Sequence, residues 1–309
     1  MLAKFAYYCF VYPISRLPLY VIYVMSDLMC FFLYYVFGYR KKIIIGNLTR
    51  SFPEKSTAEI KQIARKFYHH FTDILAEGIK NLSISEKQLR KRMVVKNPEL
   101  MKDLFDKELS VLLVSGHYNN WEWLITAQNF LFPHQAVGIG QPMTSKFWDK
   151  KINTKRARFG MRIIHASNVR KKLEQWKGEK LAILTLSDQS PPNTHKSYWM
   201  DFLNQKTAVL FGAEMLAFQY NMAVVYFETS KVKRGYYSIE LKLITENPHL
   251  CSYGEITEKH THLLEKTIQK APEFWMWSHK RWKRTLPDDF DALRTQQKRT
   301  FEEKMAQLN

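Results

Sequence analysis

The sequence contains few cysteines and none of the common signatures of metal or nucleotide binding. Its three cysteines, Cys9, Cys30 and Cys251, lack the spacing of a zinc site, and two of them lie in the apolar amino-terminal region. This usage favours a reducing compartment. No zinc-finger spacing, ribonucleoprotein motif or glycine-rich phosphate loop is present, and no ligand cluster indicates a metal. We therefore expect neither a bound metal nor a resident cofactor.

Acidic side chains are the scarcer charged class. The 309 residues include 29 Asp and Glu against 47 Lys and Arg, which gives a formal net charge of +18. So large a basic excess indicates an anionic partner, which is nucleic acid, an anionic membrane surface or an acidic carrier protein. Nucleic acid is the least favoured, because the aromatic residues gather near the amino terminus and in residues 274–282 instead of alternating along a basic stripe.

Residues 17–39 form an apolar run that only Asp27 interrupts as a charge. The run is long enough to span a bilayer, which takes about 20 residues. The basic residues 40–42 follow it directly, so the positive-inside rule places the remainder of the chain in the cytoplasm. Pro13, Pro18 and the many tyrosines leave a second arrangement open, a helix lying in the plane of the membrane surface. The length favours spanning or deep insertion.

The rest of the chain alternates between short apolar segments and amphipathic ones. This alternation predicts an α/β fold with a mixed, largely parallel sheet flanked by helices. We expect strands at residues 93–95, 111–114, 136–140, 162–165, 181–186, 223–229 and 236–245, the last two as a hairpin. We expect helices at residues 55–80, 98–107, 119–130, 145–159, 169–176 and 207–220, while residues 196–203 return toward the sheet. The predicted organisation is a membrane-anchoring segment (1–42), a catalytic domain (43–287) and a polar tail (288–309) that is a surface helix or partly disordered.

His117 and Glu122 are the strongest candidates for catalysis. His117 follows the apolar strand and the turn at Gly116, and ligands bind at this edge of open α/β sheets. With His117 in the turn and Glu122 in the first helical turn, the two side chains can meet. A carboxylate on one imidazole nitrogen fixes the tautomer and raises the basicity of the other nitrogen, which then accepts a proton from a hydroxyl. No nucleophilic serine is indicated, because Ser115 lacks an elbow motif.

A purely structural interpretation of the same residues remains open. Glu122 stands three residues after Asn119, which is the spacing of a capping box, so it could serve only the helix amino terminus. A single histidine after a strand is more often structural than catalytic.

Further polar residues near the same edge are candidates for substrate binding. Arg156 and Arg158 lie on a strongly basic helix, and either can supply the cation that a phosphate or a thioester oxygen requires. Asp188 lies in a loop after the strand at 181–186, where it caps the loop or contacts substrate. Asn120 belongs to the turn that carries His117 and completes the substrate-binding set.

In residues 272–283, three tryptophans alternate with cations. This alternation suits stacking of cations on indole rings, or an interfacial aromatic belt.

Several of these motifs together resemble one known family, the lipid A late acyltransferases (lauroyl/myristoyl acyltransferases) of the lysophospholipid acyltransferase-like superfamily. The resemblance covers roughly residues 15–285. It rests on these motifs, in order: Tyr39-Arg40, Asn47-Leu48, Phe52-Pro53-Glu54, His117-x4-Glu122, Asn153-x-x-Arg156-x-Arg158-Phe159-Gly160, Ser187-Asp188-Gln189 and Trp275-x-Trp277-x-His279-Lys280-Arg281-Trp282.

The resemblance implies an inner-membrane enzyme with a glycerolipid acyltransferase-like fold and its catalytic domain on the cytoplasmic side. Such an enzyme moves a fatty acyl chain from acyl carrier protein, or from acyl-CoA, to a hydroxyl of a membrane glycolipid. By resemblance, His117 is the general base and Glu122 its partner, while Arg156 lies near the phosphopantetheine of the donor or near the oxyanion. The implied partners are acyl carrier protein, the glycolipid acceptor and an anionic membrane surface, without nucleic acid.

The chain departs from the family pattern after the Asp-Gln loop. Many members have a Phe-Phe-Gly turn where this chain has Asp201-Phe202-Leu203-Asn204, and the loop itself carries Pro191-Pro192. We expect this region to shape the acceptor or acyl pocket. Two alternatives therefore stay open: an acyltransferase acting on another membrane lipid, such as a lysophospholipid, amino-acid lipid or glycolipid, and a non-catalytic scaffold on the membrane surface.

Overall fold

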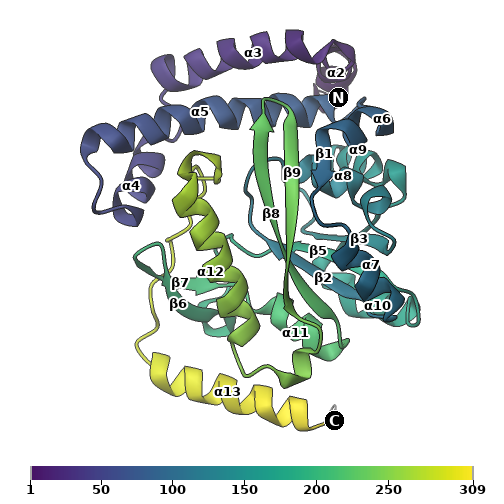
Figure 1. Cartoon of the computed structure of the whole chain (residues 1–309). Helices are drawn as coiled ribbons and strands as arrows, with labels where there is room; N and C mark the ends of the chain where they lie inside the picture. Colours follow the sequence, from purple (N-terminus) through teal and green to yellow (C-terminus); the bar gives the residue numbers. More distant parts are fainter. Residues whose placement is uncertain (1, 308–309) are drawn as a thin grey trace.

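The apolar strand segments form one seven-stranded sheet in the computed structural model, which describes residues 2–307 (Figure 1). Its order is β1-β9-β8-β2-β5-β3-β4, and β8, β2, β5, β3 and β4 are parallel. β9 pairs antiparallel with β8, and β1 pairs parallel with β9. The strands are β1 (Met93–Val95), β2 (Val111–Ser115), β3 (Gln135–Gly140), β4 (Arg162–His165), β5 (Leu181–Leu186), β8 (Ala223–Lys233) and β9 (Tyr236–Thr245). The predicted α/β fold and the seven strands are confirmed.

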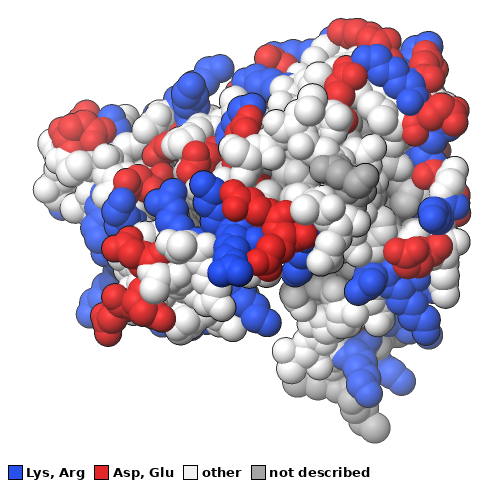
Figure 2. Space-filling model, turned by 90° about the horizontal axis from the view of Figure 1, so that it is seen from below, with Lys and Arg blue, Asp and Glu red and all other residues white. Residues whose placement is uncertain are grey.

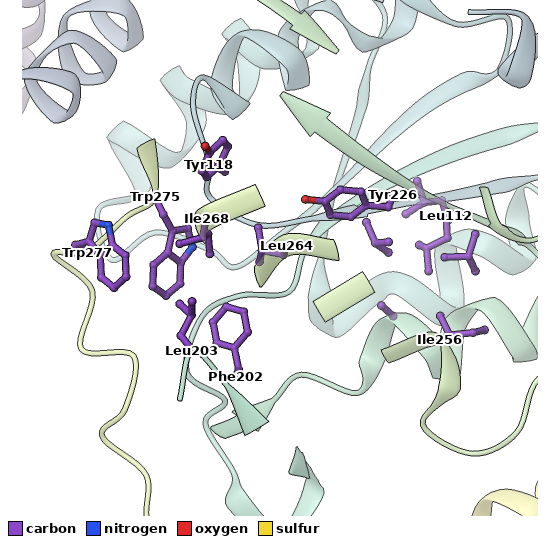
Figure 3. Close-up of a cluster of buried hydrophobic side chains, with 14 of the residues drawn as sticks. Leu112, Tyr118, Phe202, Leu203, Tyr226, Ile256, Leu264, Ile268, Trp275 and Trp277 are labelled. Atoms are coloured by element: carbon purple, nitrogen blue, oxygen red, sulfur yellow. The ribbon is translucent and has the colours of Figure 1, made fainter. Parts of the chain in front are cut away.

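Helices cover both faces of this sheet, which is why its central strands are apolar throughout. Leu112 of β2 packs into a cluster with side chains of α5, α10, α11 and α12, whereas Leu113 packs into a second cluster with α6, α7 and α8. Figure 3 shows part of the first cluster, where Trp275, Phe202 and Ile268 gather beside the sheet. The helices are α5 (Thr57–Lys80), α6 (Glu86–Arg92), α7 (Glu99–Asp106), α8 (Trp121–Leu131), α10 (Val169–Gln175), α11 (Gly212–Gln219) and α12 (Glu255–Lys270).

One predicted helix is wrong in its first part. Residues 205–209 form β7 (Gln205–Val209), which pairs antiparallel with β6 (Tyr198–Phe202) in a separate two-stranded sheet. Leu203 and Asn204 connect the two strands with φ angles of 51° and 60°, which is the backbone of a tight hairpin turn. The segment 196–203 therefore pairs with its own continuation instead of returning to the main sheet, and the helix that follows is only α11.

The apolar amino-terminal segment folds as helices that lie along the domain. α1 (Leu2–Ala6), a π-helical turn (Tyr7–Val11) and α2 (Tyr12–Arg16) precede a break at Leu17-Pro18, after which come α3 (Leu19–Phe31) and a second π-helical turn (Phe32–Val36). α3 packs against α5 along the upper edge in Figure 1. α4 (Lys41–Ser51) then leads into α5.

Among the described residues, one helix, Leu19–Val36, is long and apolar enough to cross a membrane. Only 11% of this stretch is buried, which excludes the core helix of a soluble domain as its explanation. Its inner face is polar where it meets α5: Ser26 Oγ donates to Asp73 Oδ1 at 3.0 Å, and Tyr23 OH donates to Glu77 Oε1 at 2.6 Å. The outer face exposes large apolar side chains, including Tyr20, Val24, Leu28, Phe31, Phe32, Tyr35 and Val36.

The carboxyl-terminal segment is a helix, α13 (Phe290–Ala306). Its one buried side chain within the described residues is Phe301, which packs edge-on against Phe218 of α11 with ring centroids 4.6 Å apart. Residues 308 and 309 of the predicted tail lie outside the described part of the chain. The tail is thus a docked helix, which contacts the first hydrophobic cluster through the buried Phe301 ring and the partly buried Met305.

Candidate active site

β2 brings His117 to the carboxyl edge of the sheet. Residues 111–115 are all buried, and the chain then turns at Gly116. A Cβ atom at Gly116 would lie 2.9 Å from Asp188 Oδ2 and 2.7 Å from Leu264 Cδ2, which is closer than real Cβ contacts allow. Glycine is therefore required here because the backbone passes directly against the Asp188 carboxylate.

Asp188 is the partner of His117. The His117 ring Nδ1 lies 2.6 Å from Asp188 Oδ1, and the His117 backbone N–H donates to Asp188 Oδ2 at 2.8 Å. The indole of Trp275 also donates to Oδ2, at 2.8 Å. Three donors therefore fix this buried carboxylate. Asp188 was predicted to bind substrate or cap its loop, and its actual contacts are those of a residue that orients the histidine.

The pairing with Asp188 determines which ring nitrogen of His117 is free to act. An ionised Asp188 accepts the proton on Nδ1, so the lone pair of the neutral imidazole lies on Nε2. The side-chain amide Nε2 of Gln189 lies 3.3 Å from His117 Nε2, and the Trp121 ring packs edge-on against the imidazole. The His117 side chain keeps 19% of its surface exposed. Its free nitrogen is thus positioned to accept a proton from a group that displaces Gln189.

The electrostatics of the pair agree with this geometry. Burial alone would lower the pKa of His117, but the charge and hydrogen bond of Asp188 outweigh it, with a smaller contribution from Glu122, and the pKa is raised. Burial alone would raise the pKa of Asp188, yet the His117 charge and the three hydrogen bonds lower it to about 2. Asp188 therefore stays ionised at neutral pH and strengthens His117 as a base.

Glu122 does not orient His117, contrary to the prediction. Its carboxylate forms a two-bond ion pair with the guanidinium of Arg156 in α9 (Lys146–Arg156), with Arg156 Nε at 3.0 Å from Glu122 Oε2. Asn153 Oδ1 accepts a further bond from Arg156 at 3.4 Å. A guanidinium binds both carboxylate oxygens at once, which a single imidazole nitrogen cannot do. Both oxygens of Glu122 are therefore bonded to Arg156 and not to His117. The charge of Glu122 still reaches His117 and raises its pKa.

Asn120 is buried and is not placed to contact substrate. Its Oδ1 accepts from the backbone N–H of Trp123 at 2.9 Å, which makes Asn120 the N-cap of α8. Its Nδ2 donates to Glu77. The alternative of a capping box between Asn119 and Glu122 is not what the structure shows, because Asn119 adopts a left-handed φ of 53° before the helix and Asn120 is the N-cap.

Arg158, also predicted to bind substrate, makes structural contacts. It donates to three backbone carbonyls, those of Asn81, Ile84 and Lys155, at distances of 2.6 to 2.9 Å. Its guanidinium also lies over the Phe159 ring, 4.4 Å from the centroid. Burial lowers the pKa of Arg158 to about 10. Arg158 lies in the 3-10 turn (Ala157–Phe159) after α9 and bonds this turn to the segment after α5. Of the two predicted arginines, Arg156 therefore lies beside the site, and Arg158 stabilises the structure around it.

The tryptophan-containing segment, residues 272–284, packs against the loop that carries Asp188. Trp275 and Trp277 are buried, at 2% and 0% exposure, so they form neither an interfacial belt nor a cation-stacking surface. His279 Nε2 accepts from the backbone N–H of Ser190 at 3.1 Å, and Arg284 donates to the carbonyl of Pro191 at 3.0 Å. This segment therefore fixes the loop between β5 and β6.

Sequence reasoning missed Gln189, Trp275 and His279 as parts of the site. The sequence places both His117 and Asp188 just after predicted strands, but only the structure shows that β2 and β5 are parallel neighbours whose carboxyl ends meet. Across the described residues 2–307, no group of three or more His, Cys, Asp or Glu side chains could hold a metal ion.

Comparison with known proteins places this geometry in a family. The chain matches the family model of bacterial lipid A biosynthesis acyltransferases over residues 1–284, which include the whole sheet and every residue of the site. No curated protein matches the chain significantly. The match covers well over half of the chain, and it contains the His117-x4-Glu122 motif at the end of a buried strand. The chain belongs to the bacterial lipid A biosynthesis acyltransferase family.

Proposed function

We propose that this protein transfers a fatty acyl chain directly from an acyl carrier protein thioester to a hydroxyl of a lipid A precursor. The contact that carries the proposal is the bond between His117 Nδ1 and the ionised Asp188, which leaves Nε2 as a base at the open edge of the sheet. The family supports lipid A acyltransferase activity in general. The donor, the base and its partner are the parts that we add.

In the proposed reaction, His117 Nε2 takes the proton of the acceptor hydroxyl as its oxygen attacks the thioester carbonyl. The carbon–oxygen bond forms, and the negative charge collects on the former carbonyl oxygen. When the tetrahedral intermediate collapses, the carbon–sulfur bond breaks and the thiolate leaves with the proton that His117 carried. No covalent acyl-enzyme is required. Arg156 lies close enough to affect the pKa of His117 and would stabilise the oxyanion or the donor phosphate.

The acyl carrier protein would dock on α9, which stands beside the start of α8. This helix carries Lys146, Lys150, Lys151 and Lys155 along with Arg156. Lys146 and Lys150 are exposed, whereas Lys151 is already bonded to Tyr8 OH at 2.9 Å. An acidic carrier is attracted to such a surface, and acyl-CoA, which carries fewer charges, would gain less. α9 therefore supports the carrier protein as donor.

The acceptor would reach the site from the membrane on which the amino-terminal helices rest. The lipid A family suggests a membrane-associated protein. We propose that the exposed apolar face of α3 enters the cytoplasmic leaflet of the inner membrane, where Arg40, Lys41 and Lys42 meet the anionic lipid surface. Because the inner face of α3 bonds to α5, this structure supports the in-plane arrangement more than a helix that leaves the domain.

The decisive experiment is transfer by the full-length protein in phospholipid vesicles, with a lipid A precursor as acceptor and mass spectrometry as readout. Acyl carrier protein thioester and acyl-CoA are compared as donors, and total lipids are measured alongside lipid A. His117→Ala should abolish transfer, whereas His262→Ala, an exposed histidine of α12, should leave it unchanged. Transfer to another lipid would keep the mechanism and change the acceptor. If no lipid gains an acyl chain with the wild-type protein, or if His117→Ala leaves transfer unchanged, the result would favour the non-catalytic membrane-surface scaffold.

A further inference from the structure

Glu77 of α5 is a buried carboxylate that the proposed reaction does not use. Its exposed surface is 0%, and it lies between α3, α8 and β9. An isolated carboxylate at such a position is costly, so the groups that face it determine what it does.

Three side-chain donors from three different elements converge on the two carboxylate oxygens of Glu77. Tyr23 OH of α3 donates to Oε1 at 2.6 Å, and Tyr237 OH of β9 donates to Oε2 at 2.7 Å. Asn120 Nδ2, at the start of α8, donates to Oε2 as well. The backbone carbonyl of Glu77 accepts the indole N–H of Trp123, at 3.0 Å. Each of these four contacts therefore ties α5 to a neighbouring element.

The contact with Asn120 reaches the active site directly. The Asn120 amide is held at both ends, since Oδ1 caps α8 through the Trp123 N–H and Nδ2 is held by Glu77. α8 begins one residue later and carries Glu122, the partner of Arg156, in its first turn. A displacement of the Glu77 carboxylate would therefore release the contact that holds the N-cap and would shift the Glu122–Arg156 pair relative to His117.

The contact with Tyr23 reaches the opposite surface of the molecule. Tyr23 lies on the helix whose outer face is apolar and exposed, and the next turns of α3 and α5 repeat the link through Ser26 and Asp73. Arg234, at the β8–β9 turn, binds both Asp73 of α5 and Asp27 of α3. The inner face of α3 is thus fixed by polar bonds, and Glu77 is the one of these two acids that also contacts α8.

We propose that Glu77 is a positioning residue that couples the seating of α3 on the domain to the geometry of the active site. When α3 is seated, Tyr23 completes the set of donors, Glu77 holds Asn120, and α8 presents Glu122 and Arg156 beside His117. When α3 lifts, Oε1 loses its donor and the N-cap loses its fixed partner. The coupling of seating to acyl transfer rests on the proposed function, whereas the structural link between α3 and α8 does not.

The test compares two pairs of variants in the full-length protein in vesicles. Tyr23→Phe removes the α3 hydroxyl that faces Glu77, and its control Tyr20→Phe removes a hydroxyl from the exposed face of the same helix. Glu77→Gln is matched by Glu214→Gln, a second fully buried carboxylate, which bonds the backbone N–H groups of Gly254 and Thr257 at α12.

The first readout is amide hydrogen exchange by mass spectrometry over residues 117–126, which requires no substrate. We expect faster exchange in Tyr23→Phe and Glu77→Gln and no change in either control. The second readout is transfer from acyl carrier protein thioester to the lipid A precursor. There kcat should fall about tenfold or more while KM for the donor changes less than about threefold, because a small misplacement of positioned groups costs mainly rate.

The two readouts separate the two proposals. Unchanged exchange in both Tyr23→Phe and Glu77→Gln would overturn the coupling, whatever the activity. Faster exchange in the two variants, combined with no acyl transfer by the wild-type protein, would retain the structural link and remove the proposed function. If Glu77→Gln fails to fold, Tyr23→Phe carries the test, because it deletes one hydroxyl and keeps the ring.

Discussion

Asp188 determines the strength of His117 as a base, and its removal has a predictable sign. The pKa of His117 is raised in the wild type, so the protonated and inactive form persists above pH 6.5 and activity should rise with pH through that higher value. Asp188→Asn removes the charge that raises the pKa, while burial still lowers it. The acidic limb of the kcat/KM profile should therefore move to lower pH, with a rate loss of about a hundredfold or more. Steady-state kinetics from pH 5 to 9 measures both effects, and an unshifted limb would contradict the pairing.

Arg156 and Arg158 differ in what their guanidinium groups bind, although they stand two residues apart. Arg156→Lys loses the two-bond contact with Glu122, which one ammonium cannot reproduce. We expect kcat to fall about tenfold to a hundredfold with little loss of thermal stability. Arg158→Lys removes bonds to backbone carbonyls and should lower the melting temperature more than kcat. Thermal denaturation and kinetics of both variants would show whether the two effects separate in this way.

Among the secondary-structure elements, α13 depends on one buried side chain within its described part. Phe301→Ala removes the ring that packs against Phe218, and such a truncation costs about 3 to 5 kcal/mol at a buried site. Because the only other apolar side chain of α13 on this cluster, Met305, is partly exposed, the loss should release this helix locally and leave the sheet intact. Limited proteolysis should then cut within residues 290–306 while the remaining domain stays resistant. A variant that keeps α13 protected would show that its polar contacts, such as Gln297 with Tyr253 OH, hold it.

α3 combines a polar inner face with an apolar outer face, so its two sides have separable roles. Changing the outward Val24, Leu28 and Phe31 to Ser removes apolar surface without touching the bonds to α5. We expect the variant to keep its fold and to lose much of its binding to vesicles of mixed zwitterionic and anionic lipid. Leu250→Ser, at a residue 83% exposed elsewhere, is the control and should bind as the wild type does. Flotation of the proteins with vesicles measures the difference. Equal binding of the wild type, the triple-serine variant and Leu250→Ser would contradict an in-plane contact through this face.

The charge of the molecule as a whole is strongly basic but unevenly distributed. On the face seen in Figure 2, Lys and Arg alternate with groups of Asp and Glu, so that face offers no continuous basic surface. The carrier is expected on α9 instead. Lys146→Glu with Lys150→Glu should lower kcat/KM for the acyl carrier protein thioester about tenfold at low salt, with a smaller effect at high salt, where charges are screened. The same variant should use acyl-CoA almost as the wild type does, and an equal loss with both donors would argue against carrier docking there.

The order of apolar and amphipathic segments in the sequence was sufficient to predict the parallel sheet, its strands and the helix beside each strand. The physical reason is that periodicity and strand burial are local properties, which neighbouring residues encode. The exposed apolar segment at 17–39 and the position of His117 at a strand end were likewise visible, because each depends on composition or on a turn at Gly116.

Tertiary structure alone decided which charged groups meet. Nothing near His117 in the sequence indicates that its partner is Asp188, 71 residues away, or that Glu122 binds Arg156 across two helices. The same holds for Asn120, whose partner is Glu77 of α5, and for the hairpin at 198–209, which depends on the left-handed backbone of Leu203 and Asn204. Ion pairs and buried hydrogen bonds depend on distances of about 3 Å between atoms of different elements. Such distances are fixed only when the sheet brings the carboxyl ends of β2 and β5 together and the helices pack around them.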